Sequence, residues 1–182
     1  MRPITIPAIS LALGAIAAGC GGTTAPTTPP AASPSTSASC GGSTGGTTVT
    51  TSKHIFTAHL GAGEHMYTQA QVDDVHPTDG ELMLGGEMQD MGADAMATMS
   101  GRHVEVAICD VDGRVITDAT PTMRVGDGAN GVPVPIKVAT MRGVDAGPDE
   151  THYGNNVMIM KDTARLLVTL DGDTATLVVK AG

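Results

Sequence analysis

The stretch RHVEVAICDVDGRVIT, residues 102–117, decides the fold of this chain. Its first nine residues alternate as in a β-strand, with an aliphatic face and a face of polar or small residues. The aliphatic face holds Val104, Val106 and Ile108, and the other holds His103, Glu105, Ala107 and Cys109. Asp112-Gly113 follows, a dipeptide typical of tight hairpin turns. The stretch therefore predicts a strand that continues into a hairpin.

The same kind of pattern recurs from residue 53 to residue 182. Short alternating runs lie between turn residues at 54–60, 80–88, 121–125, 132–140, 155–160, 164–170 and 174–180. About seven to nine short strands in one domain predict an all-β, immunoglobulin-like sandwich. Pro133 and Pro135 alternate within one run, which predicts an edge or bulged strand because proline cannot donate to the ladder. The turn DGDT at 171–174 predicts a last hairpin.

The first residues have the pattern of an export signal. In MRPITIPAISLALGAIAAGC one arginine precedes an apolar run that ends in small residues, and this run is too short for a comfortable membrane span. The ending Ala17–Cys20 resembles a bacterial lipobox, which implies a signal peptide over residues 1–19 and a lipid on Cys20. The alternative is an ordinary signal peptide cut nearby. Both predict an extracytoplasmic protein, and the lipobox predicts one anchored to the cell membrane.

Residues 20–52 have the composition of a linker. They are mostly Gly, Pro, Ser, Thr and Ala and include no charged residue, so they have little apolar surface to offset the entropy of ordering. We predict a disordered tether here and a domain over 53–182. If Cys20 carries a lipid, Cys40 and Cys109 remain. An oxidising compartment permits a bond between them, and the sequence leaves open whether they pair.

Composition and missing motifs argue against several function classes. Aromatic residues are 2% of the chain and the formal net charge is -9, so we expect no binding to nucleic acid, whose readers supply aromatic stacking and positive charge. There is no Gly-x-Ser-x-Gly elbow, phosphate-binding loop or dinucleotide fingerprint. We therefore expect the protein not to be an enzyme.

His103 and Glu105 are the first candidates for chemistry. Residues at i and i+2 of a strand project on one face, and an imidazole beside a carboxylate is able to share a first-row metal ion. A solvated strand face is the ordinary alternative for such a pair.

Methionine is abundant, with 11 residues against one phenylalanine. Met88, Met91, Met96 and Met99 lie within EMQDMGADAMATMS, residues 87–100. One interpretation is a short amphipathic helix or loop that packs these side chains on the domain. The other is a methionine-rich surface for a soft metal ion.

Several short motifs resemble those of one family. HYGNN at 152–156 is similar to the His-Tyr-Gly-x-Asn motif of periplasmic iron-uptake proteins, which are immunoglobulin-like, bind copper and are encoded beside iron permeases. A related treponemal metal-binding lipoprotein belongs to this group. RHVEV matches the family's His-x-Glu pair, Glu87-Met88 matches its Glu-Met pair, and Met141 is the counterpart of its methionine before the His-Tyr-Gly motif.

The resemblance implies a set of metal ligands. Carried over by position, the copper ligands are His103, Met141 and His152, and Glu105 sits at or beside the metal, where it serves a second ion such as iron. It also implies that His152 is presented by a loop, with a Tyr-Gly-Asn turn fixing its approach. The family has a further histidine near its C-terminus, whereas no histidine follows His152 here. Candidates for additional ligands are His59, His65, Met83 and Met88.

The resemblance implies a lipoprotein that binds copper, with iron as the candidate second ion, and that takes up metal or delivers it to a membrane permease. It further implies a homodimer. Two alternatives stay open. One is an immunoglobulin-like module of the cell envelope that binds a protein partner and no metal. The other is a copper-resistance protein whose methionines, Met83, Met88, Met91, Met96 and Met99, bind cuprous ions.

Overall fold

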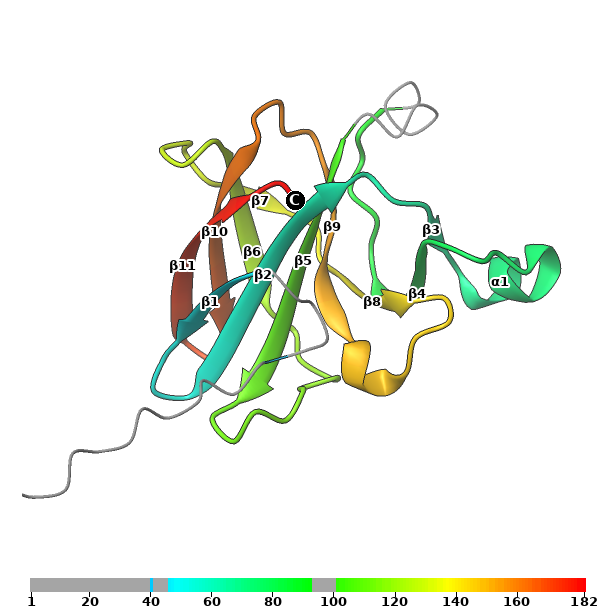
Figure 1. Ribbon diagram of the computed structural model, residues 1–182, viewed down its shortest axis with the longest axis horizontal. Helices are drawn as coiled ribbons and strands as arrows, with labels where there is room; N and C mark the ends of the chain where they lie inside the picture. The colour runs from blue at the N-terminus through cyan, green and yellow to red at the C-terminus, as the bar shows by residue number, and fades with distance from the viewer. Residues whose placement is uncertain (1–39, 41–45, 93–100) are drawn as a thin grey trace, which may run out of the picture. The chain divides into compact units, whose positions relative to one another are not determined.

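The computed structural model describes residue 40, residues 46–92 and residues 101–182. The described strands form two sheets, as Figure 1 shows. The larger sheet has seven strands in the order β1-β2-β5-β9-β8-β4-β3, and the smaller has four in the order β11-β10-β6-β7. The prediction of an all-β sandwich is confirmed.

The larger sheet consists of β1 (Thr47–Thr50), β2 (His54–Ala62), β3 (Met66–Tyr67), β4 (Glu81–Gly86), β5 (Arg102–Asp110), β8 (Ala139–Gly143) and β9 (His152–Val157). The smaller consists of β6 (Thr122–Asp127), β7 (Val134–Ile136), β10 (Thr163–Leu170) and β11 (Asp173–Lys180). A helix α1 (Gln69–Val75) and a 3-10 helix η1 (Pro148–Glu150) complete the described elements. Only the β3–β4 pair is parallel among the pairs of named strands that the structure describes.

The main core lies between the two sheets. Val104, Val106 and Ile108 of β5 are fully buried in it, as their alternation predicts, together with Phe56 of β2 and Leu166 of β10. Burial of such aliphatic and aromatic side chains supplies the main stabilising free energy of a sandwich. The opposite face of β5 points away from this core and carries the polar residues, so the fold separates packing from chemistry along one strand.

Cys40 and Cys109 form a disulfide bond, which answers the question that the sequence left open. Both cysteines are buried, and they pack with Ile55 and Ala107 in a second, smaller apolar cluster. This cluster lies on the face of β5 that turns away from the main core, because Ala107 and Cys109 alternate with Val106 and Ile108.

The predicted boundary between tether and domain is wrong by several residues. The strand β1 lies inside the predicted tether and pairs antiparallel with β2. Its sequence, TTVT, consists of β-branched residues, which favour a strand once a neighbouring strand supplies the hydrogen-bond partners. The signal peptide and the lipid on Cys20 fall outside the described residues. Among the described residues, no helix has the length and apolar character needed to cross a membrane.

The run 132–140 is not one strand but two. The chain forms β7 in the smaller sheet, passes through Lys137 and Val138, and forms β8 in the larger sheet. Alternation alone does not reveal this change of sheet, because both halves keep a period of two. The edge position predicted from Pro133 and Pro135 is confirmed, since β7 is the last strand of its sheet.

Two other segments differ from the sequence-based expectation. Residues 87–92 of the methionine-rich segment form no helix, and residues 93–100 lie outside the described part of the chain. The sequence analysis did not predict α1, which begins after a capping box formed by Thr68 and Gln71. The turn at Asp112-Gly113 is present, with Gly113 at φ 85°, but the chain after it makes only one bridge, between Val115 and Cys109.

Candidate metal centre

The candidate site lies on the face of the larger sheet that turns away from the main core. His103 and Glu105 of β5 project there, as their spacing predicts, and β9 pairs with β5 so that His103 lies opposite Asn156 and Glu105 opposite Gly154. His103 is fully buried and Glu105 is partly buried. The alternative interpretation, that these residues lie on a solvated strand face, is therefore wrong for His103.

Three buried side chains meet at this site. One ligand atom each from Glu81, His103 and His152 lies within 4.8 Å of the other two. The two imidazole rings are 6.1 Å apart between centroids and nearly perpendicular, at 88°. Nε2 of His152 lies 3.4 Å from Oε2 of Glu81. The residues come from β4, β5 and β9, which are far apart in the sequence.

The protonation of His103 follows from its neighbour Asn156. The side-chain amide of Asn156 pairs with the backbone of Glu64, donating to the Glu64 carbonyl (2.6 Å) and accepting from the Glu64 N–H (3.0 Å). That pairing identifies Oδ1 as the atom 3.0 Å from Nδ1 of His103. Since this oxygen only accepts, Nδ1 of His103 carries the proton, and Nε2 of the neutral ring presents a lone pair.

His152 is held in the same tautomer. Its Nδ1 lies 3.0 Å from the backbone carbonyl oxygen of Glu150, which only accepts, so Nδ1 donates. Nε2 of the neutral ring then presents its lone pair toward Glu81. Histidines that ligate metal ions commonly have this arrangement, in which a hydrogen bond from one ring nitrogen orients the other for coordination.

The three inward-facing atoms have no hydrogen-bond partner among the described residues. They are Nε2 of His103, Nε2 of His152 and Oε2 of Glu81, and all three are buried. A buried polar atom without a partner costs roughly 1–3 kcal/mol, so three together are unusual in a folded protein. A bound cation would satisfy all three, and the residues therefore fit a metal ion.

Electrostatics shift the pKa values of the same groups. Burial, and then the neighbouring carboxylates of Glu64 and Glu105, raise the pKa of Glu81 from 4.5 to about 8. Burial is also the main cause that lowers the pKa of His152 below 6.5. Both shifts favour neutral side chains in the metal-free protein, and a cation would reverse the shift at Glu81 by stabilising its ionised form.

A second group of ligand atoms adjoins the first. Glu64, Glu81 and Glu105 each offer a carboxylate oxygen within 4.8 Å of the other two. Glu81 belongs to both groups, so its carboxylate stands between a histidine side and a carboxylate side of the site. Carboxylate oxygens suit harder cations than imidazoles and thioethers do.

Methionines flank the histidine side. Met141 of β8 lies directly opposite His152 of β9, and Met83 of β4 lies opposite Met141. Side chains that face each other across paired strands project on the same side of the sheet. Met141 is fully buried, and Met83 is half-buried. The structure thus places Met141 beside His152, as the resemblance implies.

The other predicted ligands lie at varying distances from the site. Nδ1 of His59 is 4.0 Å from a carboxylate oxygen of Glu105, which places His59 at the rim of the carboxylate group. His65 is exposed. Met88 follows β4 in the irregular segment 87–92. Its neighbour Glu87 is exposed and forms an ion pair with Lys137 at 3.0 Å, so the carboxylate at the site comes from Glu81 and not from the Glu87-Met88 pair.

The expectation that a loop presents His152 is wrong. His152 is the first residue of β9, and Tyr153, Gly154 and Asn155 continue the strand instead of forming a turn. A Cβ at Gly154 would lie 1.7 Å from the carbonyl oxygen of Val104, so only glycine allows β9 to approach β5 this closely. The motif is extended because β9 pairs with β5 on one side and β8 on the other.

The remaining motif residues bind other parts of the domain. The hydroxyl of Tyr153 donates to the carbonyl of Ile116 (2.8 Å) and accepts from the N–H of Ala119 (2.9 Å). The amide of Asn155 accepts from the N–H of Gln89 and donates to the carbonyl of Glu87. These contacts hold the segments after β5 and after β4, so two motif residues stabilise the surroundings of the site.

Sequence reasoning missed Glu81 and Glu64. One signal for Glu81 was present, because Glu81 and Met83 have the same i, i+2 spacing as His103 and Glu105. For Glu64 no local signal exists, since it lies between β2 and β3 and reaches the site only through the packing of that loop.

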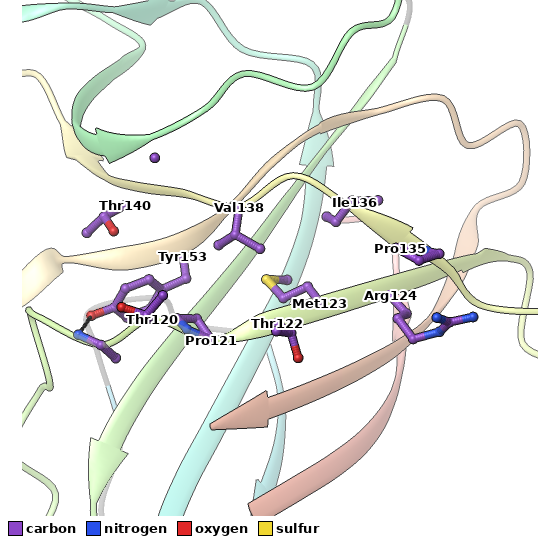
Figure 2. A pocket seen from close by; sticks show the side chains of 12 residues that line it. Thr120, Pro121, Thr122, Met123, Arg124, Pro135, Ile136, Val138, Thr140 and Tyr153 are labelled. Carbon is purple, nitrogen blue, oxygen red and sulfur yellow. Dashed lines mark hydrogen bonds between the residues drawn. The ribbon is translucent and has the colours of Figure 1, made fainter. Parts of the chain in front are cut away.

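A separate cavity lies on the other side of β9. Figure 2 shows Tyr153, Met123 and Val138 in its wall, beside Thr120 and Pro121. Its volume is about 510 Å³, and its lining includes no His, Asp, Glu or Cys. Arg124, at its edge, donates to the backbone carbonyl of Pro133 (2.8 Å). This cavity has no metal-ligating set and is distinct from the site described above.

Comparisons of this chain with protein-family models, with curated proteins and with solved structures found no match.

Proposed function

We propose that this protein is an extracytoplasmic lipoprotein that binds copper at His103, His152, Met141 and Glu81. The observation that carries the proposal is the set of three buried nitrogen and oxygen atoms that converge from β4, β5 and β9 without a hydrogen-bond partner among the described residues. A thioether is a soft donor and imidazoles bind copper well, so two imidazoles and a thioether suit copper. The resemblance of HYGNN and RHVEV to motifs of periplasmic iron-uptake proteins supports the same ligands.

The carboxylate side supports a second, harder ion. Glu64 and Glu105 share Glu81 with the histidine side, and carboxylates suit iron or manganese better than they suit cuprous copper. We propose iron at this side, in line with the resemblance. A shared carboxylate would couple the two ions, because the charge of one changes the affinity of the other.

The burial of the site supports a metal-carrying protein and not a metal-dependent enzyme. His103 is fully buried, and Glu81 and His152 are 6% and 7% exposed. Catalytic metal sites keep an open position for substrate or water, whereas closed sites hold their ion. We propose that the protein takes up metal or delivers it to a membrane permease. In this proposal a lipid on the N-terminal segment anchors the domain to the membrane, and the protein is a homodimer.

The disulfide supports the location outside the cytoplasm. Cys40 and Cys109 are bonded, and such bonds persist mainly in oxidising compartments. The signal-like first 19 residues point to the same compartment.

Titration calorimetry of the purified full-length protein tests the proposal. Cu²⁺, Cu⁺ under a mild reductant and Mn²⁺ as a stand-in for ferrous iron are added to wild type, His152→Ala and Tyr153→Phe. We expect one tight copper site in wild type, at least a tenfold loss of affinity in His152→Ala and no change in Tyr153→Phe. Tyr153 is the matched control because it lies on the same strand but binds the loop after β5.

Absence of binding by the wild type would reject the metal proposal. That outcome would favour the alternative, an immunoglobulin-like module that binds a protein partner. Copper binding that survives both His152→Ala and His103→Ala would instead point to the methionines.

A further inference from the structure

Asn156 makes two contacts that no other described residue combines. It accepts a hydrogen bond from Nδ1 of His103, and its amide pairs with both backbone polar groups of Glu64. It is 3% exposed, so these bonds are shielded from water. One side chain therefore touches a residue of the histidine side and the backbone of a residue of the carboxylate side.

The loop that carries Glu64 has few other attachments. Gly63 donates to the carbonyl of Gly101 (3.1 Å), and the N–H of Glu81 donates to the carbonyl of His65 (2.8 Å). Between these two points, the polar backbone groups of Glu64 bind Asn156. Without that pairing, the Glu64 backbone would have to find water or bend away, and its carboxylate would move with it.

We propose that Asn156 is the positioning residue of the metal site. It holds His103 in the tautomer that presents Nε2 as a ligand, and it holds the loop that places the Glu64 carboxylate beside Glu81. The proposal rests on the proposed function and adds to it a link between the two sides. Loss of Asn156 loosens both sides at once, although Asn156 itself contacts no metal.

The first test uses the metal-free wild-type protein. Long-range ¹H–¹⁵N NMR correlations of the histidine rings, recorded above the pH at which imidazole titrates, report which ring nitrogen carries the proton. We expect His103 to be protonated at Nδ1. A proton at Nε2 would overturn the proposal, and this measurement needs no variant to fold.

The second test compares Asn156→Leu with Asn155→Leu. Both residues are buried asparagines, but the side chain of Asn155 binds the backbone of Gln89, Glu87 and Asn156 and contacts neither His103 nor Glu64. We expect Asn156→Leu to lower copper affinity by 10–100-fold, the usual cost of removing a residue that orients a ligand. We also expect it to abolish the single tautomer of His103 and to speed hydrogen exchange at the Glu64 amide. Asn155→Leu should change none of these three readouts, even where it lowers stability.

Equal effects of the two variants on copper affinity would overturn the proposal, because they would show a general loss of structure. If Asn156→Leu does not fold, Asn156→Asp replaces it. This variant keeps the oxygen that accepts from His103 and from the Glu64 N–H, but it cannot donate to the Glu64 carbonyl. His103 should therefore stay protonated at Nδ1, while the ¹³C chemical shift of the Glu64 carbonyl should change because that oxygen loses its donor. An unchanged carbonyl shift would overturn the proposal. If the wild type binds no metal, the proposed function fails, and the tautomer and exchange measurements still decide the role of Asn156.

Discussion

Glu81 shows how the position of one residue changes its chemistry. On the surface a glutamate is ionised at neutral pH, but here burial and two nearby carboxylates raise its pKa to about 8. The metal-free site thus avoids three close negative charges by keeping a proton. A metal ion that binds must displace this proton, so metal affinity is expected to rise with pH in this range.

The raised pKa makes a prediction about stability without metal. Between pH 4.5 and about 8, folded Glu81 keeps a proton that the unfolded chain has released. Its contribution to stability is therefore complete below pH 4.5 and is lost as the pH rises through about 8. Glu81→Gln has no such proton. Relative to this variant, the unfolding free energy of the wild type should fall as pH rises.

Urea denaturation in the presence of a chelator measures this difference. His152 contributes the opposite trend, because its lowered pKa costs stability as the pH falls through 6.5, but both proteins contain it. The comparison with Glu81→Gln removes most of that contribution. A difference that does not vary with pH would show that Glu81 titrates normally.

At the level of elements, β9 organises the site. It pairs with β5 and β8 and is buried along its whole length, so its residues contact both the main core and the metal face. The close approach of β9 to β5 depends on Gly154, where a Cβ would collide with the Val104 carbonyl. The strand pairing, and not a loop, sets the distance between His152 and His103.

We expect Gly154→Ala to force β9 away from β5. Overpacking of this kind costs ~1–3 kcal/mol, and copper affinity should fall as well because the two histidines separate. Gly147→Ala is the control, since Gly147 has no atom within 4 Å of an added Cβ and an extended φ of -82°. Thermal unfolding and copper titration of both variants check the prediction. Equal stability of the two would mean that β9 shifts without strain.

At the level of the whole molecule, the disulfide connects the segment before β1 to the strand that carries His103 and Glu105. It joins residues separated by 69 positions, so it restricts the unfolded chain strongly. The bond also covers Ile55 and Ala107 on the face that carries the site. Cross-linking thus stabilises a domain with few aromatic residues.

Cys40→Ala should lower the unfolding free energy by ~2–5 kcal/mol. A reductant that opens the bond in the wild type should produce a similar loss, and it should have no further effect on Cys40→Ala. Denaturant unfolding of both proteins with and without reductant measures these values. A wild type whose stability does not depend on the bond would contradict the prediction.

Local sequence determined the features that depend on neighbours along the chain. The alternation of residues 102–110 predicted β5 with its correct faces, Asp171-Gly172 predicted the turn between β10 and β11, and the prolines at 133 and 135 predicted an edge strand. Period, turn chemistry and the missing N–H of proline are properties of a few consecutive residues. The all-β class and the shared face of His103 and Glu105 followed from them.

Only the tertiary structure decided which residues share the site. Glu81, His103 and His152 lie on β4, β5 and β9. They meet because these strands belong to one sheet, in which the order β5-β9-β8-β4 brings segments that are distant in the sequence together. Strand order depends on pairing between distant segments, which the local period of two does not encode. The same reason explains why Glu64 was missed and why residues 132–140 divide between two sheets. It also explains why Thr47–Thr50 joins a sheet although it lies at the end of a segment with the composition of a linker.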